Sequence, residues 1–354
     1  MPLSAVFHTH SLQEQVAALG DAFAIAGEFL HCDTINSGHI NLTFRAAYRR
    51  EDGTTDRYIF QRVNDAVFPC PRDVMHNVEK VTNHIRWKML RVLKTPFRQT
   101  LNLYSARGCR KYLEIPGSGF WRCYNCIKST HTFDVAEHPR QAHEAARAFG
   151  AFQQLLCDMN PEDIHETIPF FHHTRKRFDR LMEAAAGDAR GRLDSCRSEL
   201  EFIRGREQYV DILTDLLEQG KLPVRIVHND TKINNVMLDR KTDRAVCVID
   251  LDTVMPGSIL YDFGDMVRTM TSPAAEDEED LSKTFLRMPM FEAVVKGYAD
   301  TVKDFITPQE IAGLAFSGLL ITLETGIRFL TDYLEGDVYF KTEKPHHNLY
   351  RART

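Results

Sequence analysis

The chain has 354 residues, of which 43% are hydrophobic and 26% are charged, and its formal net charge is −5. This length allows about two domains of roughly 100–200 residues, and the composition is that of an ordinary globular protein. The negative charge argues against a protein that binds nucleic acid through bulk charge. The eight cysteines have no regular spacing, so we expect reduced thiols in a cytoplasmic protein.

No segment of the sequence predicts a membrane association. The first residues, MPLSAVFHTHSLQEQV, lack the basic and apolar regions of a signal peptide. The longest apolar tract, 311–323, is shorter than the roughly 20 residues that span a bilayer, so we expect a core helix there. The C-x-x-C of Cys123 and Cys126 lies in an apolar, strand-like stretch, which favours buried thiols over a redox or metal site.

The first part of the chain is predicted to be β-rich. Apolar periodicity predicts a helix over 13–29, and Asp73 is predicted to cap a second helix that ends near residue 92. Strand-like patterns with a glycine turn follow at 35–49, and further strands are expected at 57–64 and 116–128.

The second part is predicted to be mainly helical. Helices are expected at 142–157, 170–186 and 193–218, followed by two short strand-like runs, RIVHN and AVCVID, and further helices. Strand patterning gives way to helical patterning between residues 127 and 134. We therefore predict an α+β protein with two domains, 1–128 and 129–354.

The strongest chemical signal is HNDTKINNVMLD, residues 228–239. Its pattern H-x-D-x-x-x-x-N is the catalytic-loop signature of kinase-type phosphotransferases. Asp230 is the candidate catalytic base, which accepts or orients the proton of an attacking hydroxyl. Asn235 is a candidate magnesium ligand, and His228 is expected to hold the loop. The alternative is an Asx-rich turn before a strand.

A second aspartate follows at the expected distance. Asp250 stands twenty residues after Asp230, at the end of the apolar run AVCVI. Residues 241–243 supply turn chemistry between the two strands of a hairpin. Asp250 is therefore the candidate second metal ligand. Asp252, which is predicted to share its strand face, is another candidate for contact with metal or substrate.

A literal Asp-Phe-Gly, the metal-binding tripeptide of protein kinases, occurs at 262–264. No strand leads into it, and ILYDFGDMVRTM has the pattern of a helix start. We therefore interpret the tripeptide as a decoy. Asp262 or Asp265 is expected to hydrogen-bond the catalytic loop or to cap a helix.

Phosphate contacts are expected in the β-rich part. His39 and Asn41, in SGHIN, could contact phosphate or substrate, or could form a polar hairpin turn. Gln61 occupies the place where a kinase-like strand presents a nucleotide-binding lysine. Arg62 is expected on the opposite strand face. Glu79 is the candidate for the glutamate of the following helix.

These motifs together resemble the aminoglycoside phosphotransferase and choline kinase superfamily. The resemblance covers nearly the whole chain, from GHIN and YIFQRVN through FHHTRKRF to IDLDTVMPGS and RFLTDYLEGDVYF. The last two point to the branch that phosphorylates N-acetylhexosamines at the anomeric position. The resemblance implies a two-lobed, protein-kinase-like fold, with a small β-rich N-terminal lobe and a larger helical lobe.

The resemblance also implies roles for individual residues. Asp230 becomes the base and a substrate contact, with Mg²⁺ held by Asn235 and Asp250. The implied sugar contacts are His39, Asn41, Arg328 and Tyr339, and the implied nucleotide contacts are Gln61, Tyr124, Cys126 and Ile127. The last three belong to a hinge at 124–127 whose backbone would contact adenine.

Other interpretations stay open. Arg328 could instead form an ion pair with Glu324, four residues earlier, and Tyr339 could be a half-buried aromatic residue. The acceptor could be another sugar, an amino alcohol or an aminoglycoside, and the chain could be a non-catalytic nucleotide-binding protein. We expect a monomer that binds ATP and a small sugar, with no nucleic acid or membrane partner.

Overall fold

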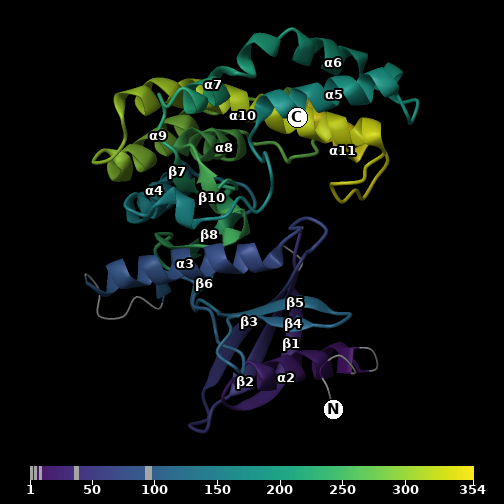
Figure 1. Ribbon diagram of the computed structural model, residues 1–354. Coiled ribbons are helices and arrows are strands. Elements are labelled where there is room, and N and C mark those ends of the chain that lie inside the picture. The colour runs from purple at the N-terminus through teal and green to yellow at the C-terminus, as the bar shows by residue number, and fades with distance from the viewer. Residues whose placement is uncertain (1–2, 4–5, 8–9, 36–39, 92–97) are drawn as a thin grey trace. The chain divides into compact units, whose positions relative to one another are not determined.

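We describe the protein from a computed structural model (Figure 1), which covers residues 3, 6–7, 10–35, 40–91 and 98–354. The chain forms two compact units. The first comprises Met1–Thr130 with two short segments, Ile164–Ile168 and Ile249–Thr253, and the second comprises the remainder. The division after residue 130 lies close to the predicted one after 128, but no sequence pattern indicated that the two short segments pack with the first unit.

An antiparallel five-stranded sheet, ordered β1–β2–β3–β5–β4, forms the first unit. Its strands are β1 (Glu28–Ile35), β2 (Leu42–Arg49), β3 (Thr55–Val63), β4 (Leu113–Ile115) and β5 (Gly119–Asn125). Alternation along the strands places Phe44, Phe60 and Trp121 in one buried cluster with Leu19 of α2 (Leu12–Ala22). Figure 1 shows α2 along this face of the sheet.

The opposite face of the sheet carries polar side chains. Gln61 of β3 pairs with Arg122 of β5 in the strand register, so the two side chains lie on one face. The helix α3 (Pro71–Leu90) contributes Met75, whose sulfur is 4.0 Å from Arg122 Nη1. Gln61, a predicted nucleotide contact, therefore lies on this polar face.

Two sequence predictions for the first unit are wrong in detail. The helix predicted over 13–29 ends at Ala22, because positive φ angles at Ala24 (+50°) and Gly27 (+106°) turn the chain into β1. The second helix begins before Asp73, since Pro71 supplies the first-turn φ angle and lies at the helix start. The strand predicted at 57–64 is confirmed by β3.

The second unit is mainly helical. Its helices are α4 (Pro139–Leu156), α5 (Thr174–Gly187), α6 (Arg197–Arg204), α7 (Ile212–Glu218), α8 (Ile259–Thr271), α9 (Met288–Val302), α10 (Pro308–Glu335) and α11 (His347–Arg353). Strand β7 (Arg225–Val227) pairs with β10 (Met255–Gly257), and β8 (Val236–Asp239) pairs with β9 (Ala245–Val248) beside β6 (Thr130–His131). The helix predicted over 193–218 is instead split into α6 and α7, because α6 ends at Arg204, directly before Gly205.

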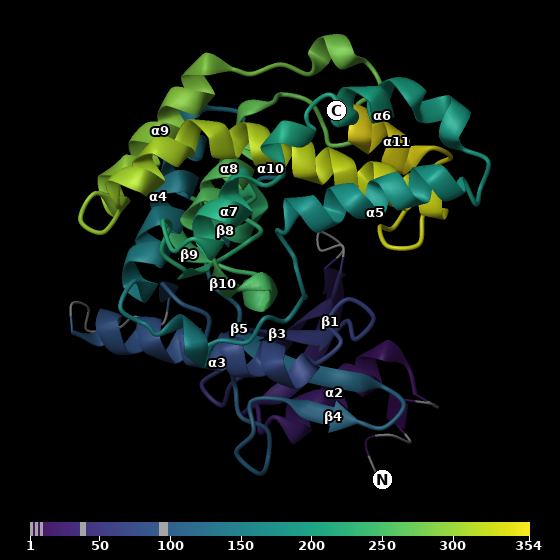
Figure 2. The same ribbon diagram turned by 45° about the horizontal axis from the view of Figure 1, so that its top comes forward.

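The long helix α10 is a core element of this unit. By length and composition alone it could cross a membrane, but 44% of its most apolar window is buried within the protein. It packs against α5, α8 and α11, and Figure 2 shows α5, α10 and α11 running alongside one another. The prediction of a core helix at 311–323 is confirmed.

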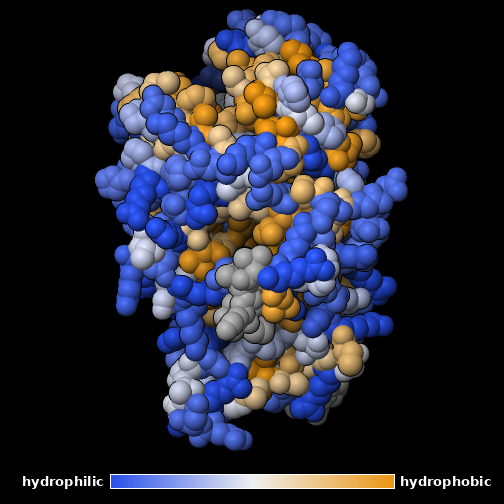
Figure 3. Space-filling view, turned by 90° about the vertical axis from the view of Figure 1, so that its left-hand side faces the viewer, coloured by the Kyte–Doolittle hydropathy of each residue, from blue (hydrophilic) through white to orange (hydrophobic). Residues whose placement is uncertain are grey.

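The predicted α+β class is also confirmed, with the β-sheet in the first part of the chain and the helices in the second. All eight cysteines are free thiols, as expected. Polar and charged side chains cover most of the face drawn in Figure 3, with apolar side chains in small groups between them.

Candidate active site

The predicted catalytic loop, residues 228–235, connects β7 to β8 in the second unit. His228 is fully buried, with its ring 5.3 Å and 5.7 Å from the rings of Phe149 and Phe152. Its Nδ1 accepts a hydrogen bond from the amide of Asp230 (3.3 Å). His228 therefore holds the loop, as the sequence predicted.

Two carboxylates of α8 hold the same loop. Asp262 accepts the amides of His228 (3.0 Å) and Asn229 (2.7 Å), and Asp265 accepts the amide of Thr231 (2.8 Å). Asn229 has a φ of +65°, in the left-handed region that few side chains adopt. These bonds hold the backbone in that unusual conformation, and they confirm that Asp262 and Asp265 bind the catalytic loop.

The literal Asp-Phe-Gly at 262–264 is therefore a structural element. Asp262 has no exposed surface, and its Oδ2 also accepts a hydrogen bond from Gln153 Nε2 (2.7 Å). Burial raises the pKa of Asp262, opposed by the charge of His228 and the hydrogen bonds. A Cβ atom at Gly264 would lie 2.4 Å from the carbonyl of Ser317, so glycine allows the close approach of α8 and α10.

Asp230, in contrast, is partly exposed, with 26% of its side chain accessible. Its Oδ1 lies 3.2 Å from Lys232 Nζ, and its Oδ2 accepts a hydrogen bond from Asn235 Nδ2 (3.0 Å). Burial raises the pKa of Asp230, but the charges of Lys232 and His228 and the hydrogen bonds lower it below its ordinary value overall. The carboxylate is therefore ionised at neutral pH and able to accept a proton.

Asn235 directs its amide nitrogen into the loop. Nδ2 also donates to the carbonyl of Asp230 (2.8 Å), which leaves Oδ1 as the atom able to bind a ligand. A neutral oxygen suits Mg²⁺, which prefers oxygen ligands and is commonly bound through one or two carboxylates together with substrate phosphates. Among the residues that the structure describes, no cluster of three or more His, Cys, Asp or Glu side chains could hold a metal alone.

The sequence analysis did not single out Lys232, although the signal was available. A lysine two residues after the candidate base is part of the same loop, and its ammonium group pairs with Asp230. The charge of Asp230 is the main cause that raises the pKa of Lys232. The loop therefore presents a positive charge directly beside its carboxylate.

Asp250 and Asp252 lie in the first unit and do not share a strand face as predicted. Strand β9 ends at Val248, and Asp250, which is exposed, has a φ of +59°. A 3₁₀ turn, Leu251–Thr253, then carries Asp252 inward, where it is 3% exposed. The prediction was wrong because strand alternation does not continue through a positive φ angle.

Asp252 pairs with a buried arginine. Arg122 is 1% exposed and contacts both carboxylate oxygens, at 2.5 Å and 2.9 Å. Asn41 Nδ2 donates to Asp252 Oδ2 (2.6 Å), and Asn41 Oδ1 accepts the amide of Asn64 (3.0 Å). Both amide atoms of Asn41 thus bind protein groups, and its predicted contact with substrate stays a prediction. His39, its companion in SGHIN, lies outside the described residues.

Arg122 also binds Gln61, which stands at the place of the expected lysine of β3. Gln61 Oε1 accepts hydrogen bonds from Arg122 Nε (3.1 Å) and Nη2 (2.9 Å), so the cation lies on the neighbouring strand. Burial lowers the pKa of Arg122, but the charge of Asp252 outweighs burial and raises it, so the group stays charged. The ion-pair partner of Arg122 is Asp252. Glu79, the candidate glutamate of the following helix, forms no ion pair with any residue that the structure describes.

The predicted hinge, residues 124–127, comprises the end of β5 and the two residues after it. Tyr124 is buried, with its ring centroid 5.0 Å from the guanidinium carbon of Arg122. The amide of Cys126 donates to a carbonyl of β3 (3.1 Å), and the carbonyl of Ile127 accepts a hydroxyl hydrogen bond (2.8 Å). These groups have partners within the first unit, and their contact with adenine stays a prediction.

Arg328, the predicted acceptor contact, lies on α10 in the second unit. Its guanidinium carbon is 4.8 Å from the ring centroid of Phe171 and 5.6 Å from that of Phe340. The alternative of a direct ion pair with Glu324 is not found: that carboxylate binds His172 and Thr174, and Arg328 acts on it only through its charge, which lowers the pKa of Glu324. Among the described residues, Arg328 has no carboxylate within ion-pair distance.

A buried aspartate positions the segment that carries Tyr339. Asp332 accepts the amides of Val338 (2.9 Å), Tyr339 (2.8 Å) and Phe340 (3.0 Å). Tyr339 is 48% exposed. The sequence analysis missed Asp332, although an aspartate in an apolar helix, four residues before a glycine, was a usable signal. It fixes the aromatic ring of Phe340 near Arg328.

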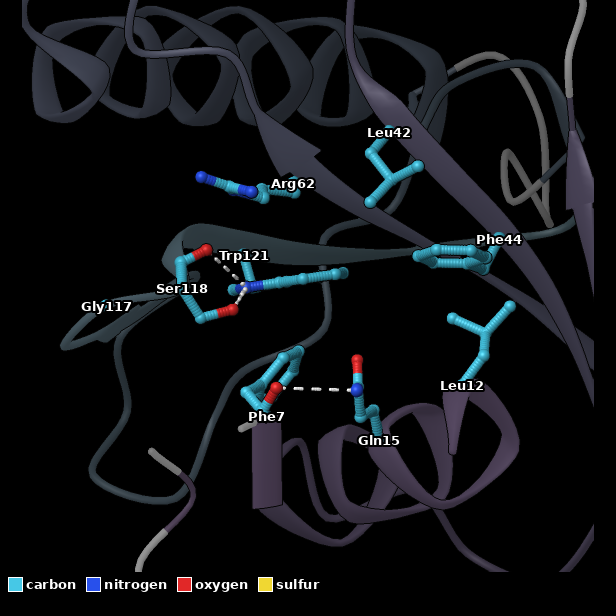
Figure 4. Close-up of a pocket in the computed structure, with 9 residues that line it drawn as sticks. All are labelled: Phe7, Leu12, Gln15, Leu42, Phe44, Arg62, Gly117, Ser118 and Trp121. Atoms are coloured by element: carbon cyan, nitrogen blue, oxygen red, sulfur yellow. Dashed lines mark hydrogen bonds between the residues drawn. The ribbon is translucent and has the colours of Figure 1, made fainter. Parts of the chain in front are cut away.

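A pocket of about 210 Å³ lies on the other face of the first unit's sheet (Figure 4). Phe7, Phe44 and Trp121 line it, and Arg62 forms one side. Trp121 precedes Arg122 in β5, so alternation separates this pocket from the Arg122 pair. Arg62 therefore lies on the face opposite to Gln61, as predicted, and the pocket is not part of the candidate site.

Comparison with known proteins identifies the family. The sequence model of APH, the phosphotransferase enzyme family, matches residues 31–287. The chain therefore belongs to this family and is a phosphotransferase.

Solved structures share the fold at low sequence identity. An aminoglycoside phosphotransferase from Alicyclobacillus acidocaldarius has a TM-score of 0.61 and 12% identity over 95% of this chain and 90% of its own. Aminoglycoside 2'-phosphotransferase-IIIa, solved as a GDP complex, has a TM-score of 0.59 and 11% identity over 97% of both chains. A microcompartment-associated aminopropanol kinase has a TM-score of 0.53 and 15% identity over 96% of this chain and 94% of its own.

Asp262→Asn is expected to lower stability while sparing nucleotide binding. The amide has one acceptor atom where the carboxylate uses two, so at least one buried donor loses its partner, at a cost of about 1–3 kcal/mol. Urea unfolding measures this loss, and titration with Mg-ADP measures binding. A well-folded variant that no longer bound metal and nucleotide would show that Asp262 is a ligand after all.

Lys232→Met is expected to move the acidic limb of the pH profile of kcat/KM to higher pH. The lysine lowers the pKa of Asp230, so its removal raises that pKa and the base protonates at higher pH. Lys241→Met, in the exposed β8–β9 turn, is the matched control. An acidic limb that coincides with that of the control would contradict the electrostatic coupling.

Arg122→Met is expected to destabilise the fold by about 3–5 kcal/mol, because it leaves the buried carboxylate of Asp252 without a counter-charge. The double variant Arg122→Met/Asp252→Leu removes both charges and should recover part of this loss. Chemical denaturation of the three proteins tests the pair. A double variant less stable than Arg122→Met would contradict this explanation.

Proposed function

We propose that this phosphotransferase transfers the γ-phosphate of ATP to the anomeric hydroxyl of an N-acetylhexosamine, GlcNAc or GalNAc, and releases the sugar 1-phosphate. The observation that carries the proposal is the group formed by the charge of Arg328 and the two aromatic rings that lie beside it. Phe171 and Phe340 offer rings of the kind that pack against the apolar face of a sugar.

The charge of this region favours a neutral acceptor over a cationic one. Arg177 donates two hydrogen bonds to the carbonyl of Phe171 (3.1 Å and 3.4 Å), beside the ring that Arg328 covers. Burial and the charge of Arg328 lower the pKa of Arg177. Two neighbouring guanidinium groups repel amino alcohols and aminoglycosides, which carry positive charge, and leave a neutral sugar unaffected.

In this mechanism Asp230 orients the anomeric hydroxyl and accepts its proton. The hydroxyl oxygen bonds to the γ-phosphorus while the bond from that phosphorus to the bridging oxygen breaks, and ADP leaves. Lys232 adds positive charge beside Asp230. Asn235 and Asp250 would hold Mg²⁺, which neutralises charge on the nucleotide phosphates when bound. Positioning and electrostatic stabilisation supply most of the rate enhancement.

The low pKa of Asp230 fits this acceptor. An anomeric hydroxyl is more acidic than an ordinary alcohol, so a weak base suffices. Structures with the same fold include kinases named for aminopropanol and ethanolamine, and a kinase of such an amino alcohol, or of an aminoglycoside, is the second candidate. We place the enzyme in the cytoplasm as a monomer.

A substrate panel with coupled detection of ADP tests the proposal. GlcNAc and GalNAc should support ADP release, and ³¹P NMR should locate the phosphate on the anomeric carbon. Ethanolamine, aminopropanol and aminoglycosides should support little. Preferential turnover of any of these amines would establish the second candidate, and tight Mg-ATP binding without any turnover would indicate a non-catalytic protein.

Asp230→Asn is expected to lower kcat by about 10²–10⁴-fold, because the amide cannot accept the proton. Mg-ATP affinity should change little, since the loop keeps its fold. Initial rates and calorimetric titration measure the two quantities. Near-normal turnover by Asp230→Asn would remove Asp230 from its role as the base.

A further inference from the structure

His172, in the segment before α5, has one ring nitrogen without a partner. Its side chain is 8% exposed, and its Nδ1 lies 2.7 Å from Glu324 Oε1. Its Nε2 is inaccessible to solvent, and no atom of the described residues forms a hydrogen bond with it. A buried polar atom in this state destabilises a protein unless a ligand or water supplies the partner.

Glu324 holds the other ring nitrogen of His172. It is 1% exposed, and its second oxygen accepts a hydrogen bond from Thr174 Oγ1 (2.5 Å). Burial raises the pKa of Glu324, but the charge and hydrogen bond of His172 and the other contacts lower it overall. An ionised carboxylate only accepts hydrogen bonds, so Nδ1 carries a hydrogen in this pair, and Nε2 is the ring nitrogen that is left to bind a ligand.

The surroundings of His172 connect the catalytic loop with Arg328. Its ring stacks on that of Tyr261 (4.8 Å between centroids, 27° between planes), and Tyr261 directly precedes the loop-binding Asp262. Glu324 stands one helical turn before Arg328 on α10. His172 thus contacts both the helix that holds the loop and the helix that carries the acceptor arginine.

We propose that His172 Nε2 forms a hydrogen bond with a hydroxyl group of the acceptor, other than the hydroxyl that is phosphorylated, and that Glu324 orients the imidazole for this contact. The inference rests on the proposed function and narrows it, because it requires an acceptor with at least two hydroxyl groups. A monohydroxy amino alcohol would leave Nε2 without its partner.

Two substitutions separate the nitrogens of the ring. His172→Asn places an amide where Nδ1 lies, so it keeps a donor for Glu324 and removes the group at Nε2. His172→Gln places an amide near Nε2 and loses the donor for Glu324. His143→Asn, at a partly exposed position of α4, is the control for handling and folding, and thermal unfolding checks all variants.

The test is a set of double-mutant cycles, in which a substitution in the protein is combined with the removal of one hydroxyl group from the substrate. The kcat/KM of the unaltered protein and of His172→Asn is measured with GlcNAc and with its 3-deoxy, 4-deoxy and 6-deoxy analogues. For one analogue we expect the unaltered protein to lose about 10–100-fold. His172→Asn should lose a similar factor with GlcNAc and nothing further with that analogue, while KM for ATP stays constant. His172→Gln should restore part of the loss.

Other results would overturn the inference. An equal loss by His172→Asn with all four sugars would show that Nε2 binds a structural water or only packs, and no loss would show that it does not contact the acceptor. Failure of the unaltered protein to phosphorylate GlcNAc and GalNAc would instead overturn the proposed function, and the hydroxyl contact with it.

Discussion

The turn between β7 and β8 depends on the buried carboxylate of Asp262. The loop ends in a 3₁₀ turn at Ile233–Asn235, and in its first part Asp262 binds the amides of His228 and Asn229, where the chain adopts a positive φ angle. Nδ1 of His228 then accepts the amide of Asp230, and Asn235 Nδ2 donates to the carboxylate of Asp230. A buried carboxylate is stable in this position because several donors replace its lost hydration.

Carboxylates of similar sequence context therefore do different work. Asp262 has no exposed surface and binds backbone amides, Asp252 neutralises a buried arginine, and Asp230 remains partly exposed beside a lysine. Arg122 likewise lies at a different position from the cation that a kinase-like strand would carry. The cation lies on β5, where it donates to the side-chain oxygen Oε1 of Gln61 and is paired with Asp252.

Regular elements were predictable where local patterns are strong. Strand β3 and helices α4 and α8 follow from alternation or helical periodicity in their own residues. The predicted helix at 13–29 failed because Phe23 and Ile25 continue a helical pattern while the backbone turns at Ala24. Helical periodicity depends only on which side chains are apolar. Phe23 and Ile25 are apolar and buried although they lie beyond the end of the helix, so the pattern did not reveal where the helix ends.

By itself the sequence determined the class of chemistry, because the order and spacing of Asp230, Asn235 and Asp250 depend only on chain distance within a loop and a hairpin. It also indicated that Asp262 is structural, since no strand precedes it. Only the tertiary structure decided the partners of Asp252, Arg328 and His172. Those partners lie 152 residues away for His172 and 130 for Asp252, and contacts at such separations follow from packing of whole elements rather than from any local pattern.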